Sequence, residues 1–68
     1  MSINTGLKYI IVDNDETDED DKEIVYTVTE IDGEWAMIEY TQYSTGMDDS
    51  IRVASLEKKL NSGEYKLV

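Results

Sequence analysis

The stretch from Glu23 to Tyr43, EIVYTVTEIDGEWAMIEYTQY, constrains the fold of this chain more than any other feature. Two runs rich in β-branched and aromatic residues flank the dipeptide Asp32-Gly33. Both central positions of a type I′ turn require a positive φ, which Asp and Gly tolerate best. The pattern therefore predicts a β-hairpin with Asp32 and Gly33 at its turn, and we expect the rest of the chain to pack on it.

A two-residue turn there would also set the register of the two strands, with Ile31 opposite Glu34 and Thr27 opposite Ile38. One face would contain Val25, Thr27, Thr29, Ile31, Glu34, Ala36, Ile38 and Tyr40. The other face would contain Ile24, Tyr26, Val28, Glu30, Trp35, Met37, Glu39 and Thr41. Apolar residues are equally frequent on both, unlike a sheet with one face in water. We expect one face to form the core and the other to be covered by the rest of the chain, a second copy or a partner.

Shorter elements are predicted on either side of the hairpin. Leu7 to Val12 (LKYIIV) is typical of a strand. Alternation places three of its apolar side chains on one face: Leu7, Tyr9 and Ile11. After the hairpin, Tyr43 to Asp49 indicates a turn around Gly46, and Ser50 to Ala54 a short strand.

The next segment predicts a short helix. Ser55 can cap the segment LEKKLNS, in which Leu56 and Leu60 form an apolar stripe. Gly63 follows at the position where a left-handed residue often ends a helix. We expect the last strand at Glu64 to Val68.

This order of elements, five short strands with one helical turn before the last, resembles the SH3-like small barrel. Tyr9 to Asp13 (YIIVD) stands where SH3 domains carry an ALYDY-type stretch. The family's later Pro and Tyr are missing, so binding of proline-rich peptides is not implied. The predicted fold class is mainly β, in a single domain over residues 1–68. We expect either a small SH3-like five-stranded barrel or a curled antiparallel sheet with one short helix before the last strand.

The charge of the chain limits its partners. It has 16 acidic and 6 basic residues and a net charge of -10, which repels nucleic acid and anionic membranes and attracts basic surfaces. Solubility alone would also explain this charge. Half of the carboxylates lie in Asp13 to Glu23 (DNDETDEDDKE), where no apolar residue favours packing, so we predict an exposed loop. Its candidate partner-binding residues are Asp13, Asp15, Glu16, Asp18, Glu19, Asp20 and Asp21.

A calcium site is an alternative interpretation of this acidic run. It offers ligands at four positions of an EF-hand loop: Asp13, Asp15, Thr17 and Asp21. However, Asp18 replaces the glycine of the sharp turn and Ile24 replaces the bidentate glutamate. We therefore predict no dedicated metal site, and weak, non-specific binding of divalent cations stays open.

The residues that most often carry catalysis are absent, since the chain has no histidine and no cysteine. A pair of carboxylates would need a cleft that desolvates one of them, and a chain of 68 residues has little room for one. No apolar run approaches the ~20 residues of a membrane span, and the N-terminus lacks the regions of a signal peptide. We predict a complete cytoplasmic protein that is not an enzyme and binds no cofactor.

In the predicted register, aromatic and acidic side chains share one face of the hairpin. This candidate partner-binding or oligomer face consists of Tyr26, Glu30, Trp35, Met37 and Glu39. In a domain with so few apolar residues, the aromatic residues are expected first of all in the core. The alternative is a partly exposed aromatic patch rimmed by carboxylates, which suits a basic protein target. Arg52, the only arginine, is either a surface residue paired with carboxylates or an anchor for an anion.

The acidity, the lack of cysteine and the closing phrase SLEKKLNSGEYKLV resemble the short accessory proteins of tailed bacteriophages. The resemblance implies a protein that disables a host factor or defence system in the host cytoplasm. We predict an acidic inhibitor of a basic, nucleic-acid-binding protein, with no direct contact with nucleic acid or membrane. The alternatives are an oligomeric sequestrator of a small nucleotide signal and a structural or assembly subunit. A homodimer or higher oligomer stays open.

Overall fold

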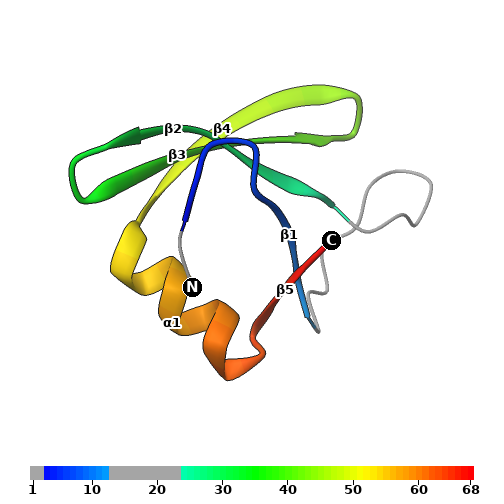
Figure 1. The fold of residues 1–68 in the computed structure, drawn as a ribbon. Helices are drawn as coiled ribbons and strands as arrows, with labels where there is room; N and C mark the ends of the chain where they lie inside the picture. The colour runs from blue at the N-terminus through cyan, green and yellow to red at the C-terminus, as the bar shows by residue number, and fades with distance from the viewer. Residues whose placement is uncertain (1–2, 13–23) are drawn as a thin grey trace.

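A computed structural model describes residues 3–12 and 24–68 of the chain. It contains five strands and one helix: β1 (Lys8–Ile11), β2 (Tyr26–Asp32), β3 (Trp35–Gln42), β4 (Thr45–Arg52), α1 (Val53–Ser62) and β5 (Tyr65–Leu67). Neighbouring strands are antiparallel and form one sheet in the order β4-β3-β2-β1-β5 (Figure 1). Over the described residues β4 and β5 do not pair, so the sheet is open. Of the two predicted architectures, the curled antiparallel sheet with a helix before the last strand is observed.

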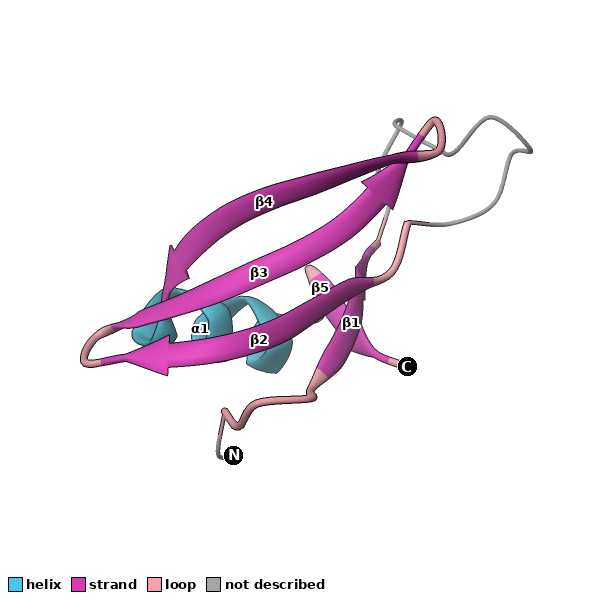
Figure 2. Ribbon diagram, turned by 90° about the horizontal axis from the view of Figure 1, so that it is seen from above, coloured by secondary structure: helices cyan, strands magenta, loops and turns pink. Residues whose placement is uncertain are grey.

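The helix links the two edges of the sheet and covers one of its faces. It begins at the end of β4 and leads into β5, and Figures 1 and 2 together show it beneath β2 and β3. Leu56 and Leu60 of α1 are buried in the core, as the predicted apolar stripe requires. The core consists of Tyr9, Ile24, Tyr26, Val28, Ala36, Ile38, Leu56 and Leu60. We call the side of the sheet that α1 covers the inner face and the opposite side the outer face.

A β-bulge in β2 decides which side chains reach the inner face. Ile31 lies opposite Ala36 and Val28 lies opposite Ile38, so three steps along β2 match two steps along β3. Thr29 is the extra residue, and its hydroxyl donates to a main-chain carbonyl oxygen of β3 at 3.4 Å. Because the alternation of side chains restarts at the bulge, Val28 and Ile31 both face the core although they are three residues apart.

The turn of this hairpin lies one residue later than predicted. Asp32 pairs with Trp35, so the central residues are Gly33 and Glu34. Gly33 has a φ of 59° and Glu34 has a negative φ, which matches a type II′ turn and not the predicted type I′ turn. The predicted register is therefore wrong. The predicted faces are correct for Glu30, Ile31 and residues 35–41, because the later turn shifts the pairing by two residues. The bulge reverses the faces before Thr29, so Tyr26 lies in the core and Trp35 on the outer face.

A second hairpin, formed by β3 and β4, is longer than the sequence predicts. Its turn consists of Tyr43 and Ser44, with φ of 52° and 61°, and β4 already begins at Thr45. The predicted turn over residues 43–49 and the strand over residues 50–54 are therefore wrong in their bounds. The segment TGMDDS is poor in strand-forming residues. It is ordered because every residue of β3 pairs with one of β4 without a break.

The helix begins at Val53, and Ser55 does not cap it. Arg52 occupies the N-cap position and makes no side-chain capping hydrogen bond. The Val53 N–H donates to the carbonyl oxygen of Glu34 at 2.8 Å, so the first hairpin turn satisfies a donor at the helix N-terminus. The C-terminal end agrees with the prediction, because Gly63 adopts a left-handed φ of 88°.

The strand β1 presents to the core the face that its alternation predicts. Tyr9 is buried, and Leu7 and Ile11 pack against the core. Two hydrogen bonds extend the ladder between β1 and β5. The Val12 N–H donates to the Glu64 carbonyl oxygen at 2.9 Å, and the Val68 N–H donates to the Lys8 carbonyl oxygen at 3.2 Å. These bonds hold the C-terminal edge of the sheet against β1.

Truncating the core at Leu56 should remove much of the stability of this small domain. Leu56 is 0% exposed, and Leu→Ala at such sites costs about 2–5 kcal/mol of a total near 5–15 kcal/mol. Leu67→Ala, at 46% exposure, is the matched control and should cost less than about 1 kcal/mol. Urea denaturation measures both changes. Equal losses from the two variants would contradict the position of the helix on the sheet.

Glycine at the second turn should stabilise the β3–β4 hairpin. Ser44 has a φ of 61°, and a residue other than glycine costs on the order of 1 kcal/mol there. Ser44→Gly should therefore raise the free energy of unfolding by about that amount. Thr45→Gly, one residue later in the strand, should lower it by about 0.5–1 kcal/mol. A loss of stability from both variants, measured by thermal denaturation, would argue against the two-residue turn.

Candidate functional site

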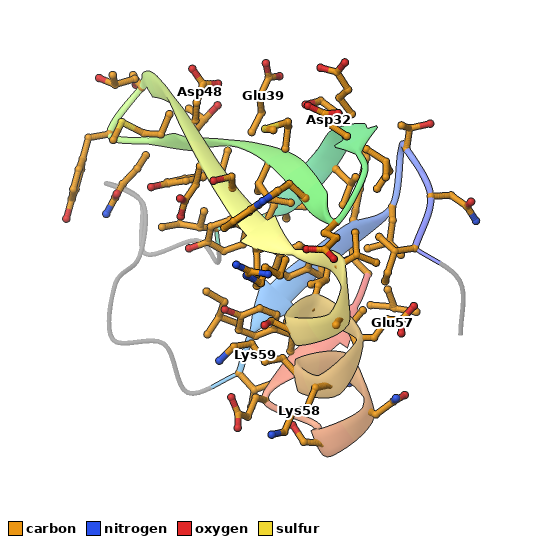
Figure 3. The ribbon with its side chains drawn as sticks, turned by 90° about the vertical axis from the view of Figure 1, so that its left-hand side faces the viewer. Asp32, Glu39, Asp48, Glu57, Lys58 and Lys59 are labelled. Atoms are coloured by element: carbon orange, nitrogen blue, oxygen red, sulfur yellow. The ribbon has the colours of Figure 1, made fainter. Side chains whose placement is uncertain are left out.

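The outer face of β2, β3 and β4 gathers carboxylates from three strands. Asp32 pairs with Trp35 near the first turn, and Glu39 pairs with Asp48 further along the sheet. We call the acidic face the exposed carboxylates on this side and at its turn: Glu30, Asp32, Glu34, Glu39 and Asp48. In Figure 3, Asp32, Glu39 and Asp48 point away from the helix. The fold therefore separates these charges from the core and presents them together.

Glu39 and Asp48 form a pair of like charges across the β3–β4 ladder. They are direct cross-strand partners, and such side chains have Cβ atoms about 4.5–5.5 Å apart. Like charges at that separation destabilise a sheet. Lys8 lies in the same cross-strand row, but Thr27 stands between Lys8 and Glu39. Among the described residues no ion pair involves Glu39 or Asp48.

Trp35 lies at one end of the acidic face and is held there by Arg52. The indole is 40% exposed, and the guanidinium carbon of Arg52 lies 4.9 Å from the ring centroid. Arg52 Nη1 also donates to Glu34 Oε2 at 3.3 Å. Arg52 is thus a surface arginine paired with a carboxylate and an aromatic ring, and its role as an anchor for an external anion stays a prediction.

Tyr26, which the sequence placed beside Trp35, belongs instead to a row of tyrosines in the core. Its ring lies 5.2 Å from that of Tyr9 and 4.8 Å from that of Tyr40, centroid to centroid. Tyr65 stacks on the other side of Tyr9 at 5.0 Å. The row crosses β5, β1, β2 and β3 on the inner face, so Tyr26 cannot contribute to a binding site on the outer face.

The remaining predicted members of the hairpin face do lie on one side of the sheet. Glu30 pairs with Met37, and both share the outer face with Trp35 and Glu39. The predicted acidic loop residues lie outside the described residues: Asp13, Asp15, Glu16, Asp18, Glu19, Asp20 and Asp21.

Three carboxylates of the acidic face were not among the predicted site residues: Asp32, Glu34 and Asp48. Asp32 was assigned to the turn, and Asp48 to a loop where β4 in fact runs. A signal for Asp48 existed in the sequence, because a two-residue turn at Tyr43-Ser44 would have aligned it with Glu39. That turn is hard to recognise, since its two residues are neither glycine nor asparagine.

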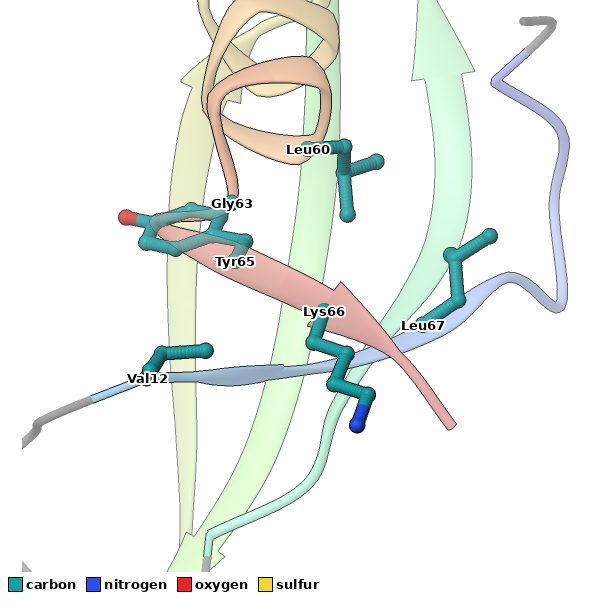
Figure 4. Close-up of a pocket in the computed structure, with 6 residues that line it drawn as sticks. All are labelled: Val12, Leu60, Gly63, Tyr65, Lys66 and Leu67. Carbon is teal, nitrogen blue, oxygen red and sulfur yellow. The ribbon is translucent and has the colours of Figure 1, made fainter.

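An open hollow of about 430 Å³ lies between the end of α1 and β5. Figure 4 shows the residues that line it: Val12, Leu60, Gly63, Tyr65, Lys66 and Leu67. Its lining is mainly apolar, with the amine of Lys66 and the phenol of Tyr65 as titratable groups. No pair of groups in this lining suits general acid and base chemistry. The hollow therefore gives no support for an enzyme, and the non-enzymatic assignment stays a prediction.

Searches of protein-family models, curated proteins and solved structures found no match to this chain. In the described part of the chain, no three Asp or Glu side chains are grouped so that they could hold a metal ion. The helix α1 is too short and too polar to cross a membrane, and the described residues contain no other candidate span. The surface chemistry of the outer face is therefore the main structural indication of function.

Two side chains on the opposite side of the molecule have a raised pKa. Burial raises the pKa of the Tyr9 phenol well above its ordinary value of 10.0. Repulsion from Tyr65, Tyr26 and Asp49 adds to this effect. The hydrogen bond from Lys59 Nζ to Glu64, 3.2 Å long, raises the pKa of the exposed Lys59 amine.

The free energy of unfolding should fall as the pH rises above about 10. The unfolded chain releases the Tyr9 proton near pH 10.0, whereas the folded protein retains it to higher pH. The contribution of the neutral Tyr9 phenol to stability is therefore complete below pH 10.0 and is lost as the pH rises from there to the raised pKa of the folded state. Tyr9→Phe should remove part of this alkaline loss. Urea denaturation between about pH 8 and 11 measures the effect. Identical pH dependence in the wild type and Tyr9→Phe would contradict it.

Proposed function

We propose that this chain is a non-enzymatic acidic protein that binds a basic surface of another protein. It would be an inhibitor of the type that tailed bacteriophages direct against host or defence proteins, acting in the host cytoplasm. The observation that carries the proposal is the opposed pair of Glu39 and Asp48, which weakens the sheet. A local arrangement that opposes folding is expected where a surface serves binding.

A basic partner would relieve the repulsion that the fold leaves in place. A lysine or arginine that approaches between Glu39 and Asp48 forms an ion pair with each of them. The cation offsets the repulsion between the two carboxylates, and this relief favours binding. The net charge of -10 would also speed the encounter and make the affinity depend strongly on salt.

Trp35 would supply the apolar part of the interface. Tryptophan and arginine are among the residues enriched at binding hot spots, and here the guanidinium carbon of Arg52 lies 4.9 Å from the centroid of the indole. Met37, partly buried on the same face, lies two residues along β3 and extends the apolar area. The acidic face would thus attract the partner, and Trp35 would slow its release.

The partner would be a protein whose basic groove normally holds nucleic acid. Neighbouring strands lie about 4.8 Å apart. Glu39 and Asp48, the one acidic cross-strand pair of the described residues, therefore lie at a spacing of the same order as the roughly 3.4 Å axial rise per phosphate of one DNA strand. Such a surface can occupy sites that bind phosphates, and duplex DNA would then compete with this chain for the partner.

The two alternative functions stay predictions from the sequence. A trap for a small nucleotide would need several available cations on one surface, whereas Arg52 is paired with Glu34 and Lys59 with Glu64. An assembly subunit would bind through the apolar part of the outer face, with little dependence on salt. Salt dependence therefore separates the inhibitor from the assembly subunit.

Neutralising the opposed pair should weaken binding and strengthen the fold. The chain has one tryptophan, so its fluorescence reports binding at the outer face when a purified, basic, histone-like bacterial DNA-binding protein is added. Glu39→Gln with Asp48→Asn should reduce the affinity about tenfold or more at low salt, a change of about 1.4 kcal/mol. The same double variant should raise the free energy of unfolding by about 0.2–1 kcal/mol.

The control variant removes two charges from the other side of the molecule. Glu57→Gln with Glu64→Gln changes the net charge equally, and Figure 3 shows Glu57 on the helix, away from the acidic face. This control should change the affinity less than about threefold, since remote exposed charges act mainly through the screened field. An equal effect of both double variants, or binding that does not depend on salt, would contradict the proposed site.

A further inference from the structure

The strand β4 forms a long edge of the sheet. It pairs with β3 at eight consecutive positions, from Trp35–Arg52 to Gln42–Thr45, and with no other described strand. An unpaired edge exposes a row of main-chain N–H and C=O groups and acts as a template for another strand. The opposite edge, β5, has only three residues.

The register shows which main-chain groups of β4 are unpaired. In a hairpin with a two-residue turn, the closing pair Gln42–Thr45 exchanges both hydrogen bonds, and every second pair does so along the ladder. The Val53 N–H, which donates to the Glu34 carbonyl oxygen at 2.8 Å, continues this alternation. The main-chain groups of Gly46, Asp48 and Ser50 therefore point away from β3.

One of these three positions is already blocked. The Ser50 N–H is not available to an added strand, because it already donates to Asp49 Oδ1 at 2.8 Å. Gly46 has no side chain, and the space where a Cβ would lie is open. Edge strands in monomeric proteins are usually blunted by charged side chains, proline or a bulge. From Thr45 to Asp49 the edge has no proline, bulge or lysine, and its charged residues, Asp48 and Asp49, are acidic. They oppose an acidic strand but not a basic one, so within the described part of the chain the edge is open to a basic strand at Gly46 and Asp48.

The side chains along this open edge indicate what could pair with it. On the outer face an added strand would lie beside Asp48, with Glu39 one strand further in. On the inner face it would lie beside Met47, which is 39% exposed, and Asp49. A second copy of β4 would bring these carboxylates against its own, which is unfavourable. A strand with basic residues at alternate positions would present them all on one face, and on the outer face they would lie beside Asp48.

We infer that the free edge of β4 accepts an extended segment of a basic partner as a sixth strand, paired at Gly46 and Asp48. This inference rests on the proposed function for the attraction to basic surfaces and adds how the partner is held. Main-chain hydrogen bonds would supply affinity, while alternate lysine or arginine side chains would contact the acidic face.

The test uses a synthetic peptide of alternating Lys and Thr residues, as long as β4. Gly46→Pro removes an unpaired N–H and leaves the charge unchanged, and proline is tolerated at edge positions of this kind. Gly46→Ala keeps the N–H and is the matched control. We expect the peptide to bind the wild type and Gly46→Ala with similar affinity, and to bind Gly46→Pro about tenfold or more weakly. Circular dichroism checks that both variants are folded.

Amide hydrogen exchange of the wild type gives a second readout that does not depend on any variant. A paired peptide should slow exchange at Gly46 and Asp48, and should leave Met47 unchanged because its N–H is already bonded to β3. Equal binding to all three proteins, without new protection at Gly46 and Asp48, would overturn the inference and leave the acidic face as the binding site.

Two further outcomes are informative. Absence of binding to any of the proteins at low salt would overturn the proposed function together with this inference. Self-association of the wild type that Gly46→Pro abolishes, measured by analytical ultracentrifugation, would assign the edge to a second copy and overturn the inference as well.

Discussion

One extra residue in β2 determines how the small apolar content of this chain is used. Because Thr29 is the extra residue of a β-bulge, Val28 and Ile31 both lie on the inner face, together with Tyr26. A regular strand would have sent the residues on one side of Thr29 to the outer face. A domain of 68 residues buries a limited area, so the concentration of apolar side chains on one face allows a single helix to complete the core.

The outer face is consequently free to carry charges that folding does not require. Features that oppose stability are concentrated in the β3–β4 hairpin. Its turn places Tyr43 and Ser44 at positive φ, and its strands oppose Glu39 to Asp48. No other described strand pairs with its edge around Gly46. Local strain of this kind is typical of surfaces that make contacts. Their common location links the proposed acidic site to the open edge, because a partner strand would meet both.

Much of the element order follows from local patterns in the sequence. Alternating β-branched residues identify the first hairpin and β1, and Gly63 marks the end of the helix. The bulge is not visible in this way, because Thr29 lies within an unbroken run of strand-forming residues. Its position depends on distant contacts: the Val28 N–H donates to the Leu7 carbonyl oxygen at 2.9 Å, and the Val28 carbonyl oxygen accepts from the Gly6 N–H at 2.7 Å.

The candidate site was predictable to a similar extent. Trp35, Glu30 and Glu39 are recognisable from the sequence as an aromatic residue with an acidic rim. The assignment of Tyr26 depended on the register, and one bulge reversed it. Asp48 was missed because β4 owes its order to pairing with β3 and not to its own propensity, and because Tyr43 and Ser44 are not typical residues of a two-residue turn.

Measuring the register of β2 on β3 tests the separation of the two faces most directly, because both the core and the acidic face depend on that register. Cross-strand nuclear Overhauser effects between backbone protons measure it. The structure predicts Ile31 opposite Ala36 and Val28 opposite Ile38. A regular register, with Thr29 opposite Ala36 and Thr27 opposite Ile38, would contradict the bulge and with it the separation of the two faces.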